Sequence, residues 1–444
     1  MKRRDLLRTS IAAASAPLIS LPRSRRPPNF LFLLVDQLHI DALSAYGCPW
    51  VRTPNIDRLI QSGVSFRQSY CTNPLCSPAR SSLLTGRMPV ETGVVNNGIP
   101  IDESIPNVGQ WLGRHGYQTV YCGKWHLPQT WQESFSGFHV IPVLGEGEGD
   151  MKDPLVALAW EAYLRQRSPE KPFFFVGSLL QPHDICFWAI QDYIPQLVPK
   201  RIPFENLVRP LPDLPPNVHS RPPAPKLIAE APWTPRDRSD EQWRFYIYCY
   251  YRMVEMLDAD VGRMLDALEA SGAAGDTVVI FTSDHGEGLG RHGHVQKHFP
   301  YEEAAKVPLV ISSPGRVSPN LRNNTHLVSG VDVVSTICDF AGIPAPPNVR
   351  GLSLKPLCEG KSPAWRDFVV TEAQQVGRMV RTKRYKYVSY QDDPVKQLFD
   401  LEADPWEMNN LYGRSQYAGV VADHHKLLEE FEAGLIPAQK PRAR

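Results

Sequence analysis

The chain has 444 residues, enough for one large domain with a smaller one beside it, and it contains no internal repeat. Its 48 Lys and Arg residues nearly balance its 47 Asp and Glu residues, so the net charge of +1 provides no overall field that would favour nucleic acid or an anionic membrane. An anionic substrate would have to be bound by a local group of basic residues.

The first 26 residues have the pattern of an export signal. A basic stretch with the pair Arg3 and Arg4 precedes a short, weakly apolar run from Ser10 to Leu21. We interpret residues 1–26 as a twin-arginine-type signal peptide, which predicts a periplasmic or secreted bacterial protein. The alternative is a disordered basic tail. The run is too short to span a membrane, and no comparable stretch follows.

Short apolar runs then alternate with helical patterns. The first run, Asn29 to Val35, is almost wholly apolar and ends at Asp36, as expected of a strand buried on both faces. Further strands are predicted at 118–122, 173–180, 277–283 and 307–312, and helices at 55–62, 104–115, 154–167, 240–271 and 331–342. This alternation predicts an α/β fold with a large, mostly parallel sheet sandwiched by helices.

Two later segments break this pattern. Residues 194–236 are rich in proline, and we interpret them as a surface insertion near the functional site. Strand-like runs at 368–371, 378–380 and 385–390, with a helix around 419–434, indicate a smaller C-terminal subdomain with an antiparallel sheet and one helix. We therefore expect a catalytic domain at 27–345 and a C-terminal subdomain at 346–444.

Three segments carry the chemistry, and each has a fixed spacing. They are Cys76-Ser77-Pro78-Ala79-Arg80 with Leu84-Thr85-Gly86-Arg87, Gly123-Lys124-Trp125-His126, and Ser283-Asp284-His285-Gly286-Glu287. Together they resemble the type I sulfatases, a formylglycine-dependent family of the alkaline phosphatase superfamily. The resemblance covers nearly the whole mature chain and implies the α/β sandwich and small C-terminal subdomain described above.

The resemblance implies a modified nucleophile at Cys76. In that family a formylglycine-generating enzyme oxidises the cysteine of C-x-P-x-R to formylglycine, whose aldehyde is hydrated. One hydrate oxygen attacks sulfur and expels the alcohol, and the other, once deprotonated, releases sulfate. Arg80 would stabilise the hydrate oxyanion, and a helix starting just after Cys76 would favour negative charge there. The twin-arginine (Tat) machinery carries folded proteins, so modification could precede export.

The resemblance also gives roles to four further catalytic candidates. Lys124 would bind the nucleophile and a sulfate oxygen, and His126 would take the proton that allows sulfate release. His183 and Lys297 would bind sulfate and protonate the leaving group, without a choice between them. His292, His294 and His298 crowd the loop around Lys297, where each could either touch substrate or be solvated.

Asp36, Gln37, Asp284 and His285 follow two predicted strands and would hold one divalent metal ion. The pairs Asp-Gln and Asp-His resemble the branch that contains choline sulfatases, phosphonate monoester hydrolases and glycan sulfatases. Ca²⁺ is expected, with Mg²⁺ and Mn²⁺ also compatible. The eight cysteines show no C-x-x-C spacing, which argues against a zinc site.

The sequence therefore predicts an exported sulfatase that hydrolyses a sulfate monoester of a small molecule or a sugar. A phosphonate or phosphate ester hydrolase of the same branch is the first alternative. A non-catalytic glycan-binding homologue is the second, and it predicts a lost ligand or signature residue. The sequence retains all of them.

Overall fold

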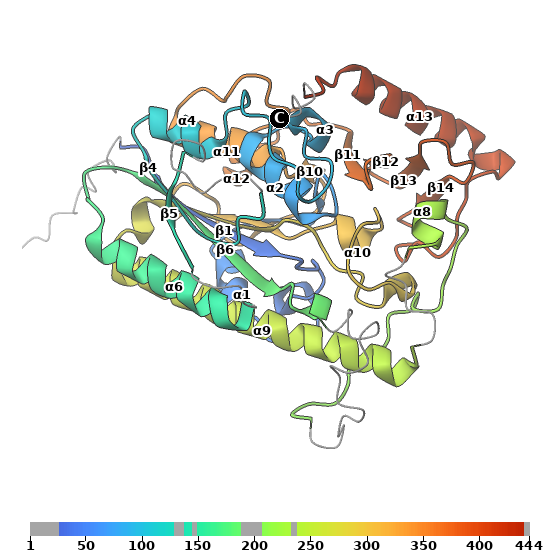
Figure 1. Cartoon of the computed structure of the whole chain (residues 1–444), viewed down its shortest axis with the longest axis horizontal. Coiled ribbons are helices and arrows are strands. Elements are labelled where there is room, and N and C mark those ends of the chain that lie inside the picture. The colour runs from blue at the N-terminus through green and yellow to red at the C-terminus, as the bar shows by residue number, and fades with distance from the viewer. Residues whose placement is uncertain (1–25, 128–136, 144–148, 188–206, 232–237, 439–444) are drawn as a thin grey trace, which may run out of the picture.

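The computed structural model describes residues 26–127, 137–143, 149–187, 207–231 and 238–438. The predicted α/β fold is confirmed: a large sheet has helices on both faces, and an antiparallel four-stranded sheet with a helix follows toward the C-terminus (Figure 1). The predicted signal peptide lies outside the described residues except for Arg26. The proline-rich insertion is described over residues 207–231.

The large sheet has eight strands. In spatial order they are β5 (His139–Ile141), β4 (Gln118–Gly123), β6 (Phe173–Pro182), β1 (Asn29–Asp36), β7 (Thr277–Ser283), β8 (Leu309–Ser312), β2 (Gly63–Phe66) and β9 (Leu321–Asn323). Neighbouring strands are parallel except where β8 pairs with β7 and with β2. The carboxyl ends of β4, β6, β1 and β7 therefore lie along one edge.

Helices cover both faces of this sheet, which explains why β1 is apolar throughout. Alternate β1 side chains enter two separate core clusters: Leu31, Leu33 and Val35 in one, Phe30, Phe32 and Leu34 in the other. The first face packs against α1 (Pro54–Gln61), α6 (Gly149–Gln166) and α9 (Asp240–Ala270). The second packs against α2 (Cys76–Thr85), α4 (Val108–Arg114) and α11 (Asp332–Ala341), and Figure 1 shows the two layers.

The C-terminal sheet consists of β11 (Phe368–Ala373), β12 (Gly377–Thr382), β13 (Tyr385–Tyr390) and β14 (Gln397–Asp400), with α13 (Ala418–Ala433) on one face. Strand β11 also supports the chain that leads to Cys76. The Thr371 hydroxyl donates to the Cys71 carbonyl at 2.7 Å, and the Glu372 N–H donates to the Thr72 carbonyl at 2.8 Å.

Several elements differ from the predicted ones in their bounds. The helix expected from residue 104 begins at Val108, because Asn107 caps it by accepting from the Gln110 N–H. Strand β14 was not predicted, because its segment is rich in turn-forming residues. The remaining short strands and α-helices are β3 (Ser69–Tyr70), β10 (Val328–Ser329), α3 (Pro89–Thr92), α8 (Lys226–Ala229), α10 (Glu302–Ala305) and α12 (Lys355–Cys358). None of the described helices is both long and apolar enough to cross a membrane.

Helix α1 is capped by a side chain of another helix. Its own N-cap, Thr53, makes no side-chain cap hydrogen bond, whereas the buried Asp258 carboxylate of α9 accepts the N–H groups of Asn55 and Ile56 at 3.1 and 2.8 Å. We expect Asp258→Ala to lower the free energy of unfolding by about 1–2 kcal/mol, because two amides lose their acceptor. Thermal or urea unfolding measures the change.

Asp266→Ala provides the matched control for this prediction. Asp266 lies on the same helix and pairs with Arg58 of α1 at 2.5 Å, but the Asp266 side chain is 67% exposed and the Arg58 side chain 36%. The control should change the stability by less than about 1 kcal/mol. Equal losses in the two variants would contradict the role of Asp258 as a cap.

Candidate active site

The site forms where the central strands end. Strand β1 ends at Asp36, the neighbouring β7 leads into Asp284 and His285, β4 leads into Lys124, and β6 leads into His183. Because these four strands are parallel neighbours, residues far apart in sequence meet at one edge of the sheet. The structure thus brings together most of the predicted site residues.

Helix α2 supplies Cys76 and Arg80 from above this edge. The helix begins at Cys76 itself, and all ten of its residues are buried. Its N-terminal amides favour a negative charge at Cys76. Arg80 lies one turn further along, on the same helical face, and reaches the ends of β1 and β7.

The Arg80 guanidinium bridges the two aspartates. Its Nε donates to Asp284 Oδ2 at 2.8 Å and one Nη donates to Asp36 Oδ2 at 2.9 Å. The other Nη donates to the Lys124 carbonyl at 2.8 Å and to Ser178 Oγ at 2.9 Å. Since a guanidinium has five N–H groups, these four bonds leave one that could reach an oxygen of the predicted nucleophile.

The second carboxylate oxygens face a common point. His285 Nε2 lies 3.9 Å from Asp36 Oδ1 and 3.6 Å from Asp284 Oδ1, and Cys76 Sγ lies 3.2 Å from His285 Nε2. The ligand atoms of Asp36, Cys76, Asp284 and His285 all lie within 4.8 Å of one another. His285 Nδ1 lies 2.9 Å from the Gly286 carbonyl, an arrangement that directs the Nε2 lone pair toward this point.

This donor set fits a divalent metal ion, because two carboxylates and an imidazole converge there and all of them are buried. Burial favours the neutral acid, yet Lys124, His183 and Arg80 hold the pKa of Asp36 well below its usual value. Burial and the neighbouring Asp36 carboxylate raise the pKa of Asp284 to about 6. A cation between these carboxylates would relieve their repulsion.

The segment Gly123 to His126 places only its lysine in the cluster. Lys124 Nζ lies 2.6 Å from Asp36 Oδ2 and 3.9 Å from Cys76 Sγ. Gly123 has φ +101°, and a Cβ there would lie 1.9 Å from the Ser178 carbonyl oxygen, so only glycine fits. The His126 side chain is exposed, while its backbone carbonyl accepts the Ser77 hydroxyl at 2.5 Å. The proton-transfer role of His126 stays a prediction.

Lys297 and His183 differ in charge. Although burial opposes the charge of Lys297, Cys186, Cys76 and Asp36 raise its pKa above the usual value. Burial together with Lys297 and Lys124 lowers the pKa of His183 to about 4, so its imidazole is neutral at pH 7. Lys297 is therefore the protonated member of the pair, and which of the two protonates the leaving group stays open.

The electrostatic surroundings of Cys76 stabilise an anion. Burial and the Asp36 carboxylate act to raise its pKa, but Lys124, Lys297 and His285 outweigh them and hold it well below the usual value. Lys124 and Lys297 would likewise stabilise an oxyanion on this residue.

The three loop histidines have different environments. His292 lies 2.9 Å from Glu303, and its ring stacks on Tyr301. His294 is buried against Phe299, with ring centroids 4.2 Å apart. Cys76 acts electrostatically on His298, and burial together with Lys297 lowers the pKa of His298 to about 4.

Three further residues contact the predicted site residues, and none of them was assigned a role from the sequence. Ser178 accepts from Arg80, and Cys186 Sγ lies 3.2 Å from the Gln37 Nε2. Glu287 accepts from the Gln37 side chain at 2.5 Å. Glu287 follows His285 by two residues in a recognised segment, and this was the one sequence signal for a role of Glu287 in the site.

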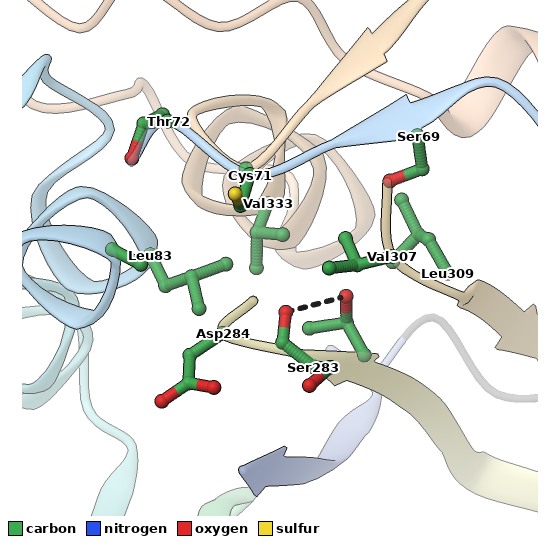
Figure 2. A pocket seen from close by; sticks show the side chains of 12 residues that line it. Ser69, Cys71, Thr72, Leu83, Ser283, Asp284, Val307, Leu309 and Val333 are labelled. Atoms are coloured by element: carbon green, nitrogen blue, oxygen red, sulfur yellow. Dashed lines mark hydrogen bonds between the residues drawn. The ribbon is translucent and has the colours of Figure 1, made fainter. Parts of the chain in front are cut away.

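Asp284 also borders a small internal cavity of about 10 Å³ between α2 and the ends of β7 and β8 (Figure 2). Leu83, Val307 and Val333 enclose it, and the Asp284 carboxylate points away from these side chains. The volume suits about one water molecule, so the cavity is too small for a substrate. The side of Asp284 that is predicted to bind the metal ion faces His285 and Cys76.

The fold and this buried cluster define a hydrolase of the alkaline phosphatase superfamily. The chain belongs to the sulfatase family, whose family model matches residues 28–343. A second family model, described as the C-terminal part of N-sulphoglucosamine sulphohydrolase, matches residues 290–434. The protein is therefore a sulfuric ester hydrolase, as predicted.

Its relatives align over nearly their whole length. A Delta 4,5-hexuronate-2-O-sulfatase of Bacteroides thetaiotaomicron is 30% identical over 92% of this chain and 89% of its own. A solved 2-O GAG sulfatase superposes with a TM-score of 0.78 and 28% identity, covering 94% and 96% of the two chains. The phosphonate monoester hydrolase of Agrobacterium radiobacter superposes with a TM-score of 0.76 and 25% identity, covering 91% of this chain and 95% of its own.

Replacing Arg80 by lysine tests whether the bridge matters as well as the charge. Arg80→Lys keeps one positive charge but cannot bind both aspartates in the same fork. We expect kcat/KM for p-nitrophenyl sulfate to fall by about 10²-fold or more. Arg87→Lys is the control, because Arg87 follows the same helix but lies outside the bridge. In the described part of the chain, its side chain donates a hydrogen bond to the Pro347 carbonyl. Wild-type activity in Arg80→Lys would exclude a need for the bridge.

Proposed function

We propose that this protein is a formylglycine-dependent sulfatase that removes sulfate from a sulfated carbohydrate. The observation that carries the proposal is the position of Cys76, at the N-terminus of α2 and 3.2 Å from His285 within the acidic cluster. Residue 76 of the C-x-P-x-R segment is thus the group that a substrate held by this cluster would meet. Formylglycine would supply a hydrated aldehyde with two oxygens on one carbon.

The surrounding residues suit the steps of ester hydrolysis. Lys124 and Arg80 lie around Cys76 and would stabilise an oxyanion there. Lys297 is buried and positively charged, so it can bind a sulfate oxygen and donate a proton as the alcohol leaves. His183 can accept or relay a proton because its imidazole is neutral. The charged groups therefore support both substrate binding and leaving-group departure.

We propose Ca²⁺ as the metal ion, held by Asp36, Gln37, Asp284 and His285. Three of the four ligands supply oxygen, which Ca²⁺ prefers, while the imidazole also keeps Mg²⁺ and Mn²⁺ compatible. The ion would polarise a sulfate oxygen and acidify the hydrate of formylglycine.

We propose a sulfated glycan as the substrate because relatives at up to 30% identity carry names that specify sulfated sugars. A panel of sulfated disaccharides, with 2-O-sulfated uronic acids included, should release sulfate measurable by ion chromatography. p-Nitrophenyl sulfate should be hydrolysed with a higher kcat/KM than a phenylphosphonate ester. Faster phosphonate turnover would favour the phosphonate ester hydrolase instead.

We further propose maturation by a formylglycine-generating enzyme and export by the twin-arginine pathway to the periplasm. The support is the C-x-P-x-R segment together with the Arg3 and Arg4 pair. Mass spectrometry of the protein from a native host tests both steps. We expect an aldehyde in the peptide that contains residue 76 and a mature N-terminus between residues 14 and 27.

Cys76→Ala supplies the functional counterpart of that measurement. It should abolish sulfate release while leaving the melting temperature nearly unchanged, because an alanine side chain fits the same helical position. An unmodified thiol in active protein, or activity in Cys76→Ala, would refute the proposed nucleophile.

A further inference from the structure

The Gln37 side chain can take two orientations that differ chemically, whereas the two oxygens of an aspartate are equivalent. Its amide could present either the oxygen or the NH₂ group to the metal cluster, and only the oxygen can coordinate a cation. The residue follows Asp36 directly and adopts φ +66°, with its N–H donating to Asp284 Oδ1 at 3.1 Å and its carbonyl accepting from the Tyr250 hydroxyl at 2.7 Å. The backbone is therefore fixed, and the remaining freedom is the orientation of the amide.

Glu287 lies on one side of that amide and is completely buried. Its Oε2 accepts from Gln37 Nε2 at 2.5 Å. Its Oε1 accepts from the Tyr246 hydroxyl at 2.7 Å and from the N–H groups of Gln296 and Leu289 at 2.7 and 3.2 Å. Every one of these partners donates, so the carboxylate acts only as an acceptor and must face the NH₂ end of Gln37.

Lys297 lies on the other side. Its ammonium group only donates, and it binds Gln37 Oε1. Cys76, Asp36 and Asp284 act electrostatically on this ammonium group, so the Gln37 oxygen points to a side chain that borders the metal cluster. Cys186 Sγ is also near both ends of the amide, but a thiol can donate or accept and does not choose an orientation.

We propose that Glu287 is a positioning residue that fixes the Gln37 amide so that its oxygen, and not its NH₂ group, is presented to the metal ion. Tyr246 of α9 and the Gln296 and Leu289 amides hold the Glu287 carboxylate in place in turn. The inference rests on the metal-dependent function proposed above. Glu287 would act on the metal ion only through the ligand Gln37. A chain with a neutral amide at position 37 thus needs a fixed acceptor behind it.

Glu287→Gln tests this assignment, because glutamine keeps the shape but can also donate, so Gln37 can turn over. The test uses the full chain, freed of metal by a chelator and titrated with Ca²⁺, Mg²⁺ or Mn²⁺ alone in a calorimeter. We expect the Kd of the ion that binds wild type most tightly to rise about 10- to 100-fold, and the metal-induced rise in melting temperature to shrink. Glu303→Gln is the matched control. Glu303 is another buried glutamate, pairs with His292, and should leave the Kd unchanged.

A charge exchange separates positioning from a general structural role. Gln37→Glu alone would place two carboxylates together beside the metal and weaken their ionisation. In the double variant Gln37→Glu with Glu287→Gln, the new glutamine can donate to the new carboxylate. We expect the double variant to bind metal more tightly than Gln37→Glu alone.

The outcomes are distinct. Unchanged metal affinity in Glu287→Gln, with or without a lower melting temperature of the metal-free protein, overturns the inference. A double variant no better than Gln37→Glu, or a wild type that binds none of the three ions, also overturns it. Metal binding that depends on Glu287 in a protein without sulfate hydrolysis would support the inference and refute the proposed sulfatase substrate instead.

Discussion

The bridge from Arg80 to Asp36 and Asp284 is the interaction on which the site depends. All three side chains are at most 1% exposed, and two buried carboxylates from adjacent strands would repel each other strongly without a cation. The guanidinium binds one oxygen of each, and the other oxygen of each faces His285 and Cys76. A single buried side chain therefore neutralises charge and sets the geometry at the same time.

The fold explains how this bridge forms. Asp36 and Asp284 are 248 positions apart, yet they follow neighbouring parallel strands whose register is fixed by apolar side chains on both faces. Helix α2 places Arg80 one turn after Cys76, so the residue that organises the aspartates also fixes the distance to the nucleophile. Strand β11 holds the segment before Cys76 through the Cys71 and Thr72 carbonyls. The C-terminal sheet thus contributes to the position of the catalytic helix.

The sequence predicted the parts of the molecule that have a strong local signal. The buried run before Asp36 and the long pattern of α9 required no tertiary information, and the sulfatase segments gave the candidate residues. Short strands such as β9 and β14 carry too few residues to show a period. Glu287 was named only as part of a segment, because its importance arises from contacts with Gln37 and Tyr246, which are distant in sequence.

The charges of the site suit a sulfate monoester and a phosphonate monoester alike. Arg80, Lys124 and Lys297 face Asp36 and Asp284, so the cluster has a small positive excess that a divalent ion would enlarge. A sulfate monoester and a phosphonate monoester each carry a single negative charge on a tetrahedral centre, so Coulomb attraction to this cluster is nearly equal for both. Selection between them must come from contacts to the uncharged substituents of that centre and to the departing alcohol. In this chain we therefore expect specificity to depend on the side chains around the cation cluster, and affinity for the anion to depend on the cluster itself.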